Sequence, residues 1–245
     1  MKAALRIGAV TAGAALVLGA AGSAYAASPG ATSSASAAAK GKTAAAQTKL
    51  AAEKQLAAAR IQGRLATLHA LSPAVQDSKY LTSNEQGTLG GQISSDTSGL
   101  TALETKAAGE TTIAAVRADQ VAMVDDYRVY LLMAPQVRLT EALAAESDAA
   151  GTLQKAYVAL SDLLAKQSGG GTAGQKSELA DLQSEITAAQ AAIGNEVASV
   201  LAIRPGPNAS AIESALAPAK SAVKTAHADL LKARGEAEAL RNSLK

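Results

Sequence analysis

The C-terminal segment 209–245 carries an apolar pattern that is satisfied by a long helix packed against other helices. Its apolar positions are separated by alternating steps of four and three residues, and they are Ile212, Leu216, Ala219, Val223, Ala226, Leu230, Ala233, Ala237, Leu240 and Leu244. A repeat of about 3.5 residues keeps such positions on one helix face and winds packed helices into a left-handed supercoil. The segment is therefore predicted to be one helix of a bundle, with Asn208 as its N-cap and Pro218 as the one misfit near its start.

Two further helices are predicted between residues 44 and 108. The first is expected to end at Ser72-Pro73, where the proline would start another turn. The second begins with Thr82 and Glu85, which have the spacing of a capping box. It also contains four glycines, each costing up to about 1 kcal/mol relative to alanine; these are Gly87, Gly90, Gly91 and Gly99. This helix is predicted to be the weakest, either frayed or held close to a neighbour through its glycines.

The middle of the chain continues the pattern with interruptions. Gly109 breaks it, Thr111 or Thr112 restarts it, and Pro135 is predicted to kink or end the helix that follows. A further stripe over 179–203 follows a Ser-Gly-Gly-Gly loop at 168–171. Short connections place successive helices antiparallel. The predicted fold is all-α: an elongated antiparallel helical bundle or coiled coil of about five long helices, without β-sheet. Heptads shared between two chains of a homo-oligomer are the alternative left open.

The composition limits how the core can be packed and which kinds of functional site the chain can form. The chain has no Cys, Phe or Trp, and about a quarter of it is Ala, which favours thin helices with close backbones because alanine adds little burial. The absence of cysteine excludes disulfides, thiolate metal sites, a catalytic thiol and a bacterial lipoprotein anchor.

The N-terminus has the pattern of a secretory signal peptide. Lys2 and Arg6 precede an uncharged apolar run, and Ala24-Tyr25-Ala26 supplies the small-x-small cleavage pattern. Cleavage is predicted between Ala26 and Ala27. A retained membrane anchor is the alternative, but the run is shorter than the roughly 20 residues that a spanning helix needs. The predicted organisation is a cleaved segment 1–26, a flexible low-complexity tether 27–43 and a helical domain 44–245, with a candidate sub-boundary at 168–174.

The charge balance gives no argument for an anionic partner. Lys2 and Arg6 are the only charged residues of the segment 1–26, so the 23 basic and 21 acidic residues of the chain become 21 and 21 after cleavage. A neutral chain has no electrostatic preference for nucleic acid or for an anionic membrane surface. Neither partner is expected.

Several patterns resemble functional motifs without meeting their requirements. The segment 169–177 is similar to a phosphate-binding loop, but its lysine comes one residue late and no strand precedes it. His69 and His227 lack a ligand partner one turn away. The acidic group formed by Asp119 and Asp125-Asp126 is expected to be a solvated helix face. No cofactor, metal site or catalytic residue is predicted.

One segment combines residue types that anchor protein interfaces. Tyr127, Arg128, Tyr130 and Arg138 lie close together in sequence around Pro135, and tyrosine and arginine are enriched among interface residues that dominate binding energy. The two tyrosines are spaced to share one helix face. The functional interpretation is a recognition patch at a helix kink; the structural one is a packing layer of the bundle.

The same segment carries a family resemblance. The stretch DYRVYLLMAPQVRLTEA at 126–142, together with DTSGLTALETKAAGETTIAAVRAD at 96–119, resembles a group of secreted, helical, coiled-coil-rich proteins of actinobacteria. The alanine-rich signal segment and the long last helix are similar too. The resemblance implies export and helical structure, and it carries over no activity and no functional residues.

The sequence thus predicts an exported, non-enzymatic structural or protein-interaction protein that works outside the membrane, at the cell envelope, against an unidentified protein or envelope partner. The alternative is a carrier of lipid or apolar cargo, or an envelope chaperone, that uses amphipathic helices. Against the alternative, no helix pairs a Trp or Phe face with a lysine-rich face.

Overall fold

The computed structural model describes residues 33–244, over which the backbone forms helices and no strand. The elements are α1 (Ser33–Gln76), α2 (Ser83–Gly109), α3 (Ile113–Asp125), the π-helical turn η1 (Val129–Met133), α4 (Ala134–Lys166), α5 (Ala173–Ile193), α6 (Glu196–Ala202) and α7 (Ala209–Ser243). Five of them, α1, α2, α4, α5 and α7, are long helices. The predicted all-α class is confirmed. The predicted cleavage site between Ala26 and Ala27 lies outside the described residues.

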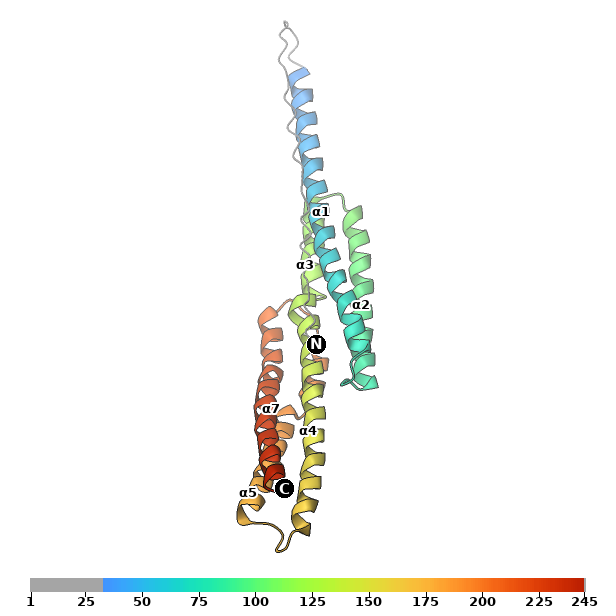
Figure 1. The fold of residues 1–245 in the computed structure, drawn as a ribbon. Coiled ribbons are helices and arrows are strands. Elements are labelled where there is room, and N and C mark those ends of the chain that lie inside the picture. Colours follow the sequence, from blue (N-terminus) through green and yellow to red (C-terminus); the bar gives the residue numbers. More distant parts are fainter. Residues whose placement is uncertain (1–32, 245) are drawn as a thin grey trace, which may run out of the picture. The chain divides into compact units, whose positions relative to one another are not determined.

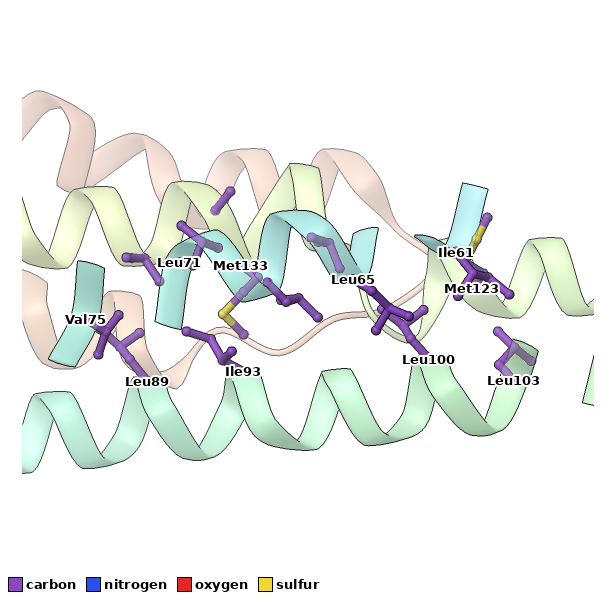
Figure 2. Packing of buried hydrophobic residues seen from close by; sticks show 14 of the residues in the cluster. Ile61, Leu65, Leu71, Val75, Leu89, Ile93, Leu100, Leu103, Met123 and Met133 are labelled. Atoms are coloured by element: carbon purple, nitrogen blue, oxygen red, sulfur yellow. The ribbon is translucent and has the colours of Figure 1, made fainter. Parts of the chain in front are cut away.

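The chain divides into two units, 1–44 and 45–245, and the helices are described here within the second. In the first cluster of buried side chains, α1, α2 and α3 pack together with η1 and the start of α4 (Figure 1). Figure 2 shows Leu65 and Leu71 of α1 in the same packed cluster as Ile93 of α2 and Met133 of η1. The second and third clusters join α4, α5 and α7. A small fourth cluster of Ala57, Ala107 and Val116 joins α1, α2 and α3. The long helix α4 contributes to the first three.

Side-chain caps fix three helix starts at predicted residues. Thr82 Oγ1 accepts from the Glu85 backbone N–H at 3.3 Å, and the Thr82 N–H donates to Glu85 at 2.7 Å, which completes the predicted capping box. Thr112, one of the two residues predicted to start this helix, caps α3, and Asn208 caps α7 as predicted. A second capping box at Thr172 starts α5. These caps satisfy backbone N–H groups that have no partner inside the helix.

Helix α1 extends beyond the predicted bounds at both ends. It begins at Ser33, inside the segment that was predicted to be a flexible tether, and it continues through Pro73 to Gln76. The prediction that Ser72-Pro73 ends the helix is wrong. Leu71 and Val75 are both buried, so the last turn is held by packing that outweighs the backbone hydrogen bond lost at the proline, an effect of about 3 kcal/mol.

Two helices predicted to be continuous are interrupted. Helix α3 ends at Asp125, before the predicted break, and Pro135 lies in the first turn of α4, which follows the π-helical turn η1 without a gap. The segment 173–203 is split at Gly194, whose φ of 41° leaves α6 as a separate short helix. Glycine adopts this left-handed region without the steric cost of a Cβ.

The glycines of α2 have different roles although the helix is continuous. A Cβ added at Gly99 would lie 2.5 Å from the Tyr127 hydroxyl, whereas one added at Gly87, Gly90 or Gly91 would meet no atom within 4 Å. Close packing through a glycine, one of the two predicted outcomes, therefore occurs at Gly99 alone. Over residues 33–244, no helix has the combined length and apolar content needed to cross a bilayer.

Candidate functional site

The four residues of the predicted recognition patch differ in exposure and backbone conformation. Tyr127 is half-buried in the turn after α3, while Tyr130 lies in η1 with 54% of its surface exposed. Arg128 between them has a left-handed backbone, with φ 44° and ψ 38°, so the helical face that would align the two tyrosines is absent. Arg138 is exposed on α4.

Arg128 holds the loop before α7. Its Nε donates to the Gly206 carbonyl at 2.8 Å and its Nη2 to the Pro207 carbonyl at 2.6 Å. The same Nη2 forms an ion pair with Asp125 at 2.7 Å, and only 10% of the arginine side chain is exposed. The guanidinium is therefore committed to tying the α3–η1 junction to the start of α7.

Tyr130 lies against α1. The Arg64 guanidinium carbon lies 5.1 Å from the centre of the Tyr130 ring, a distance at which a cation attracts the ring face. A Cβ added at Gly63 would come within 3.3 Å of the tyrosine hydroxyl. Burial lowers the pKa of Arg64, and the Tyr130 hydroxyl opposes that shift.

The aspartates of the acidic group, which was predicted to be a solvated helix face, differ in exposure. Asp119 is only 2% exposed, and its Oδ1 pairs with Lys106 Nζ of α2 at 2.6 Å, while its Oδ2 has no hydrogen-bond partner. The prediction is wrong for this residue because it faces α2. The hydrogen bond and charge of Asp119 raise the pKa of Lys106. Asp126 remains exposed.

The two histidines lie on different helices and have different surroundings. His69 is exposed on α1, and His227 Nδ1 of α7 lies 2.9 Å from a Glu146 carboxylate oxygen of α4. Among the described residues, no three or more His, Cys, Asp or Glu side chains come together as metal ligands.

A groove runs between α1 and α3, and we call it the α1/α3 groove. Two adjoining hollows of about 300 and 570 Å³ share Glu53, Leu56 and Arg117. Leu56 is 44% exposed and Val121 is 60% exposed. Large apolar side chains therefore meet solvent on both helices of one groove.

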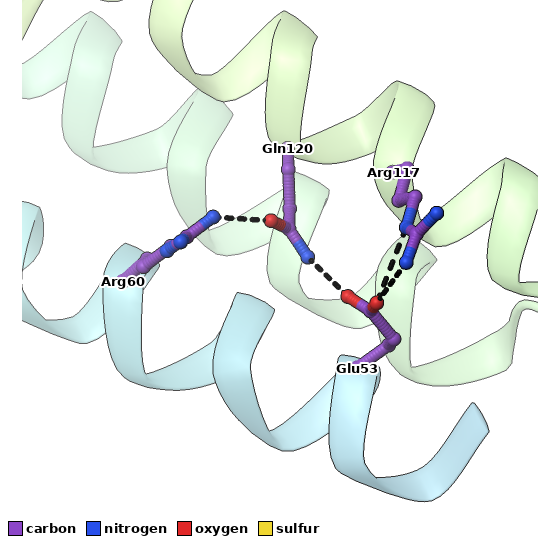
Figure 3. A network of polar contacts seen from close by, with 4 residues as sticks. All are labelled: Glu53, Arg60, Arg117 and Gln120. Atoms are coloured by element: carbon purple, nitrogen blue, oxygen red, sulfur yellow. Dashed lines mark hydrogen bonds and ion pairs between the residues drawn. The ribbon is translucent and has the colours of Figure 1, made fainter. Parts of the chain in front are cut away.

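Three charged side chains of this groove, Glu53, Arg60 and Arg117, form one network with Gln120 (Figure 3). Arg117 donates to Glu53 through Nη2 at 2.7 Å and Nε at 3.1 Å, and Gln120 donates to the other carboxylate oxygen at 3.4 Å. Arg60 donates to the Gln120 oxygen. The hydrogen bond from Arg117 lowers the pKa of Glu53. The network keeps the rim polar and the guanidinium groups in fixed positions.

A second depression of about 630 Å³ lies along α2, and we call it the α2 cleft. Its lining comes from three separate parts of the chain: α2, the segment 126–136, and the segment 203–205. Residues with side chains that carry chemistry are Gln92, Asp96, Asp126, Tyr127, Gln136 and Arg204. Burial raises the pKa of Asp96 to about 6. The pKa of Tyr127 is raised by burial, with smaller contributions from Asp126 and Asp96.

No protein-family model, curated protein or solved structure matches this chain. The resemblance to secreted actinobacterial helical proteins therefore stays a prediction.

Proposed function

We propose that this chain is an exported, non-enzymatic protein that acts outside the membrane by binding a partner protein through the α1/α3 groove. The observation that carries the proposal is the exposure of Leu56 and Val121 in one groove. Apolar patches rimmed by polar residues are typical of protein interaction sites.

The shape and charge of the groove favour an amphipathic helix of the partner as the occupant. A groove between two helices accepts the apolar face of a third helix, whose anchor residues recur every three or four positions. The charged lining comprises three cations, Lys49, Arg60 and Arg117, and two anions, Glu53 and Asp125. The favoured partner helix therefore has an apolar face with acidic flanks. Burying Leu56 and Val121 against it would supply hydrophobic stabilisation.

Matched leucine substitutions test the groove. Leu56→Glu places a charge in the groove, and Leu231→Glu places the same charge on α7, where Leu231 is 57% exposed. Quantitative cross-linking to envelope proteins of the producing cells should show a partner that is retained by the wild type and by Leu231→Glu and lost with Leu56→Glu. Equal retention by all three would exclude this groove.

Liposome co-sedimentation separates this proposal from the lipid-carrier alternative. The wild-type protein is expected to stay in the supernatant with neutral and anionic vesicles. Co-sedimentation that Leu56→Glu abolishes would assign the groove to lipid instead of protein.

The export part of the proposal is supported by the N-terminal sequence, from Lys2 and Arg6 to Ala24-Tyr25-Ala26. N-terminal sequencing of protein from the culture fluid should start at Ala27. A start at Met1 in membranes would contradict cleavage.

A further inference from the structure

We propose that the α2 cleft binds a small alkylammonium ligand, such as a linear diamine, with the Asp96 carboxylate as its counter-ion. This cleft shares no lining residue with the α1/α3 groove, and the proposal does not depend on the proposed protein partner.

The cleft has the dimensions and lining of a small-ligand site. Its volume of about 630 Å³ falls in the range of about 300–1,000 Å³ that is typical of such sites. It is open because Gly87 and Gly91 present no side chain, and a Cβ at either would meet no atom within 4 Å. The apolar part of the lining consists of Ile203 and Pro205 together with the nearly buried Leu132 and Met133.

Two glutamine side chains leave acceptors in the cleft. Gln136 is 1% exposed, and its Nε2 donates to the Val200 carbonyl at 2.7 Å. Gln92 Nε2 donates to the Leu201 carbonyl at 3.3 Å, and its buried Oε1 has no hydrogen-bond partner. Within residues 41–244, nothing donates to Gln136 Oε1 either. Because the backbone carbonyls of the α6 segment fix both amide nitrogens, both amide oxygens remain as acceptors. The buried Gln92 Oε1 is unfavourable without a donor, so a ligand that donates N–H bonds would be stabilised here.

The charge of the lining also favours a cation. Asp96 forms no hydrogen bond or ion pair with any residue of the described chain, and burial raises its pKa to about 6 because the ionised form is poorly solvated. Asp126 adds a second carboxylate to the lining. Arg204 is the one cation there, and its Nη1 donates to the Leu201 carbonyl at 2.9 Å. An ammonium group offers three donors and a compact positive charge, which matches one carboxylate and two amide oxygens.

Isothermal titration calorimetry of the full chain with 1,5-diaminopentane tests the proposal at about pH 8. We expect saturable 1:1 binding, and no binding of pentane-1,5-diol, which has the same chain without the charges. Asp96→Asn should weaken diamine binding at least about tenfold, which is about 1.4 kcal/mol. Asp181→Asn, an exposed carboxylate on α5 outside the cleft, should leave it unchanged.

A second pair of variants tests the location without changing charge. Gly91→Leu would fill the cleft, and Gly90→Leu places the same side chain at a neighbouring position outside its lining. Only Gly91→Leu should abolish binding. The proposal is overturned by no saturable heat with the diamine at concentrations up to about 10 mM, by equal affinity of the wild type and Asp96→Asn, or by binding of Ca²⁺ but not the diamine.

Discussion

Arg128 has a residue type that is common in protein interfaces, but its side chain holds two segments of its own chain together and so acts as a clamp. It is the one non-glycine residue in the described chain with a positive φ, a conformation that is uncommon for residues with a Cβ. Its side chain meets Asp125 and two carbonyls of the loop before α7. These bonds hold the backbone in the left-handed conformation that interrupts the helix between α3 and η1.

Arg128→Ala should destabilise the protein by about 2–4 kcal/mol, because hydrogen bonds to a charged group contribute about 1.5–3 kcal/mol each and water can replace part of the loss. Arg138→Ala is the matched control, since Arg138 is exposed and surface changes stay within about 0.5 kcal/mol. Urea unfolding of the two variants measures the difference. Similar losses would show that Arg128 does not act as a clamp.

Asp96 makes the stability depend on pH in the direction opposite to an ion-paired carboxylate. Its folded-state pKa of about 6 lies above the ordinary value of 3.8, so the folded state binds the proton more tightly than the unfolded state. Ionised Asp96 therefore opposes folding above about pH 6, and this penalty disappears as the pH falls towards 3.8.

Asp96→Asn should therefore raise the stability at about pH 8 by about 1–2 kcal/mol after allowance for solvent screening, with a much smaller gain at about pH 4. Thermal unfolding of the wild type, Asp96→Asn and Asp181→Asn across this range measures the effect. A gain that is the same at both pH values would contradict the assigned titration. Because the variant is expected to be more stable, loss of diamine binding in it would not reflect unfolding.

At the scale of elements, the glycines of α2 have two different roles, which the sequence alone could not distinguish. The backbone at Gly99 lies against the Tyr127 ring, whereas Gly90 faces open space. Gly90→Ala should stabilise α2 by up to about 1 kcal/mol, the difference in helix propensity. Gly99→Ala should give no gain or a loss, because the Tyr127 ring must move. Equal gains in chemical denaturation would show that the contact has no energetic importance.

Helix α7 follows its heptad pattern closely. Leu230 is 5% exposed and Leu231 is 57% exposed, so the register predicted from the sequence is correct at this point. Leu230→Ala should cost about 2–5 kcal/mol, the range for a buried leucine, and Leu231→Ala clearly less. Equal losses in urea unfolding would contradict the burial. A loss at Leu230 that shrinks with protein concentration would place the seam between chains.

The sequence predicts periodic elements better than the sites between them. The stripe of α7 and the caps at Thr82, Thr112 and Asn208 depend on neighbours within a few residues. The extension of α1 past Pro73 depends on the distant packing of Val75. The α2 cleft is lined by residues of α2 and of the segments 126–136 and 203–205. The spacing of residues along the sequence does not predict that these distant segments lie together. The small residues Gly87, Gly91 and Ser95, four apart on one helix face, are the one local signal of an open surface there.

At the scale of the molecule, α4 connects three of the four buried clusters of the segment 45–244. Val137 belongs to the first cluster, Leu143 to the second and Leu160 to the third. A helix shared by three clusters makes the loss of one cluster weaken the others, since the interior is close-packed and side chains relax only partially. The segment is therefore expected to unfold as one cooperative unit.

Leu160→Ala tests this coupling, because Leu160 packs with α5 and α7 and not with α1. The substitution should cost about 2–5 kcal/mol. If unfolding is cooperative, the most protected amides of α1, around the fully buried Leu68, should exchange with solvent faster by the same free energy as those of α7. Leu163→Ala, on the same helix at a 52% exposed position, should change neither set. Faster exchange in α7 with unchanged exchange around Leu68 would show that the helices on the two sides of α4 unfold independently, because only a shared transition carries a loss at Leu160 to α1.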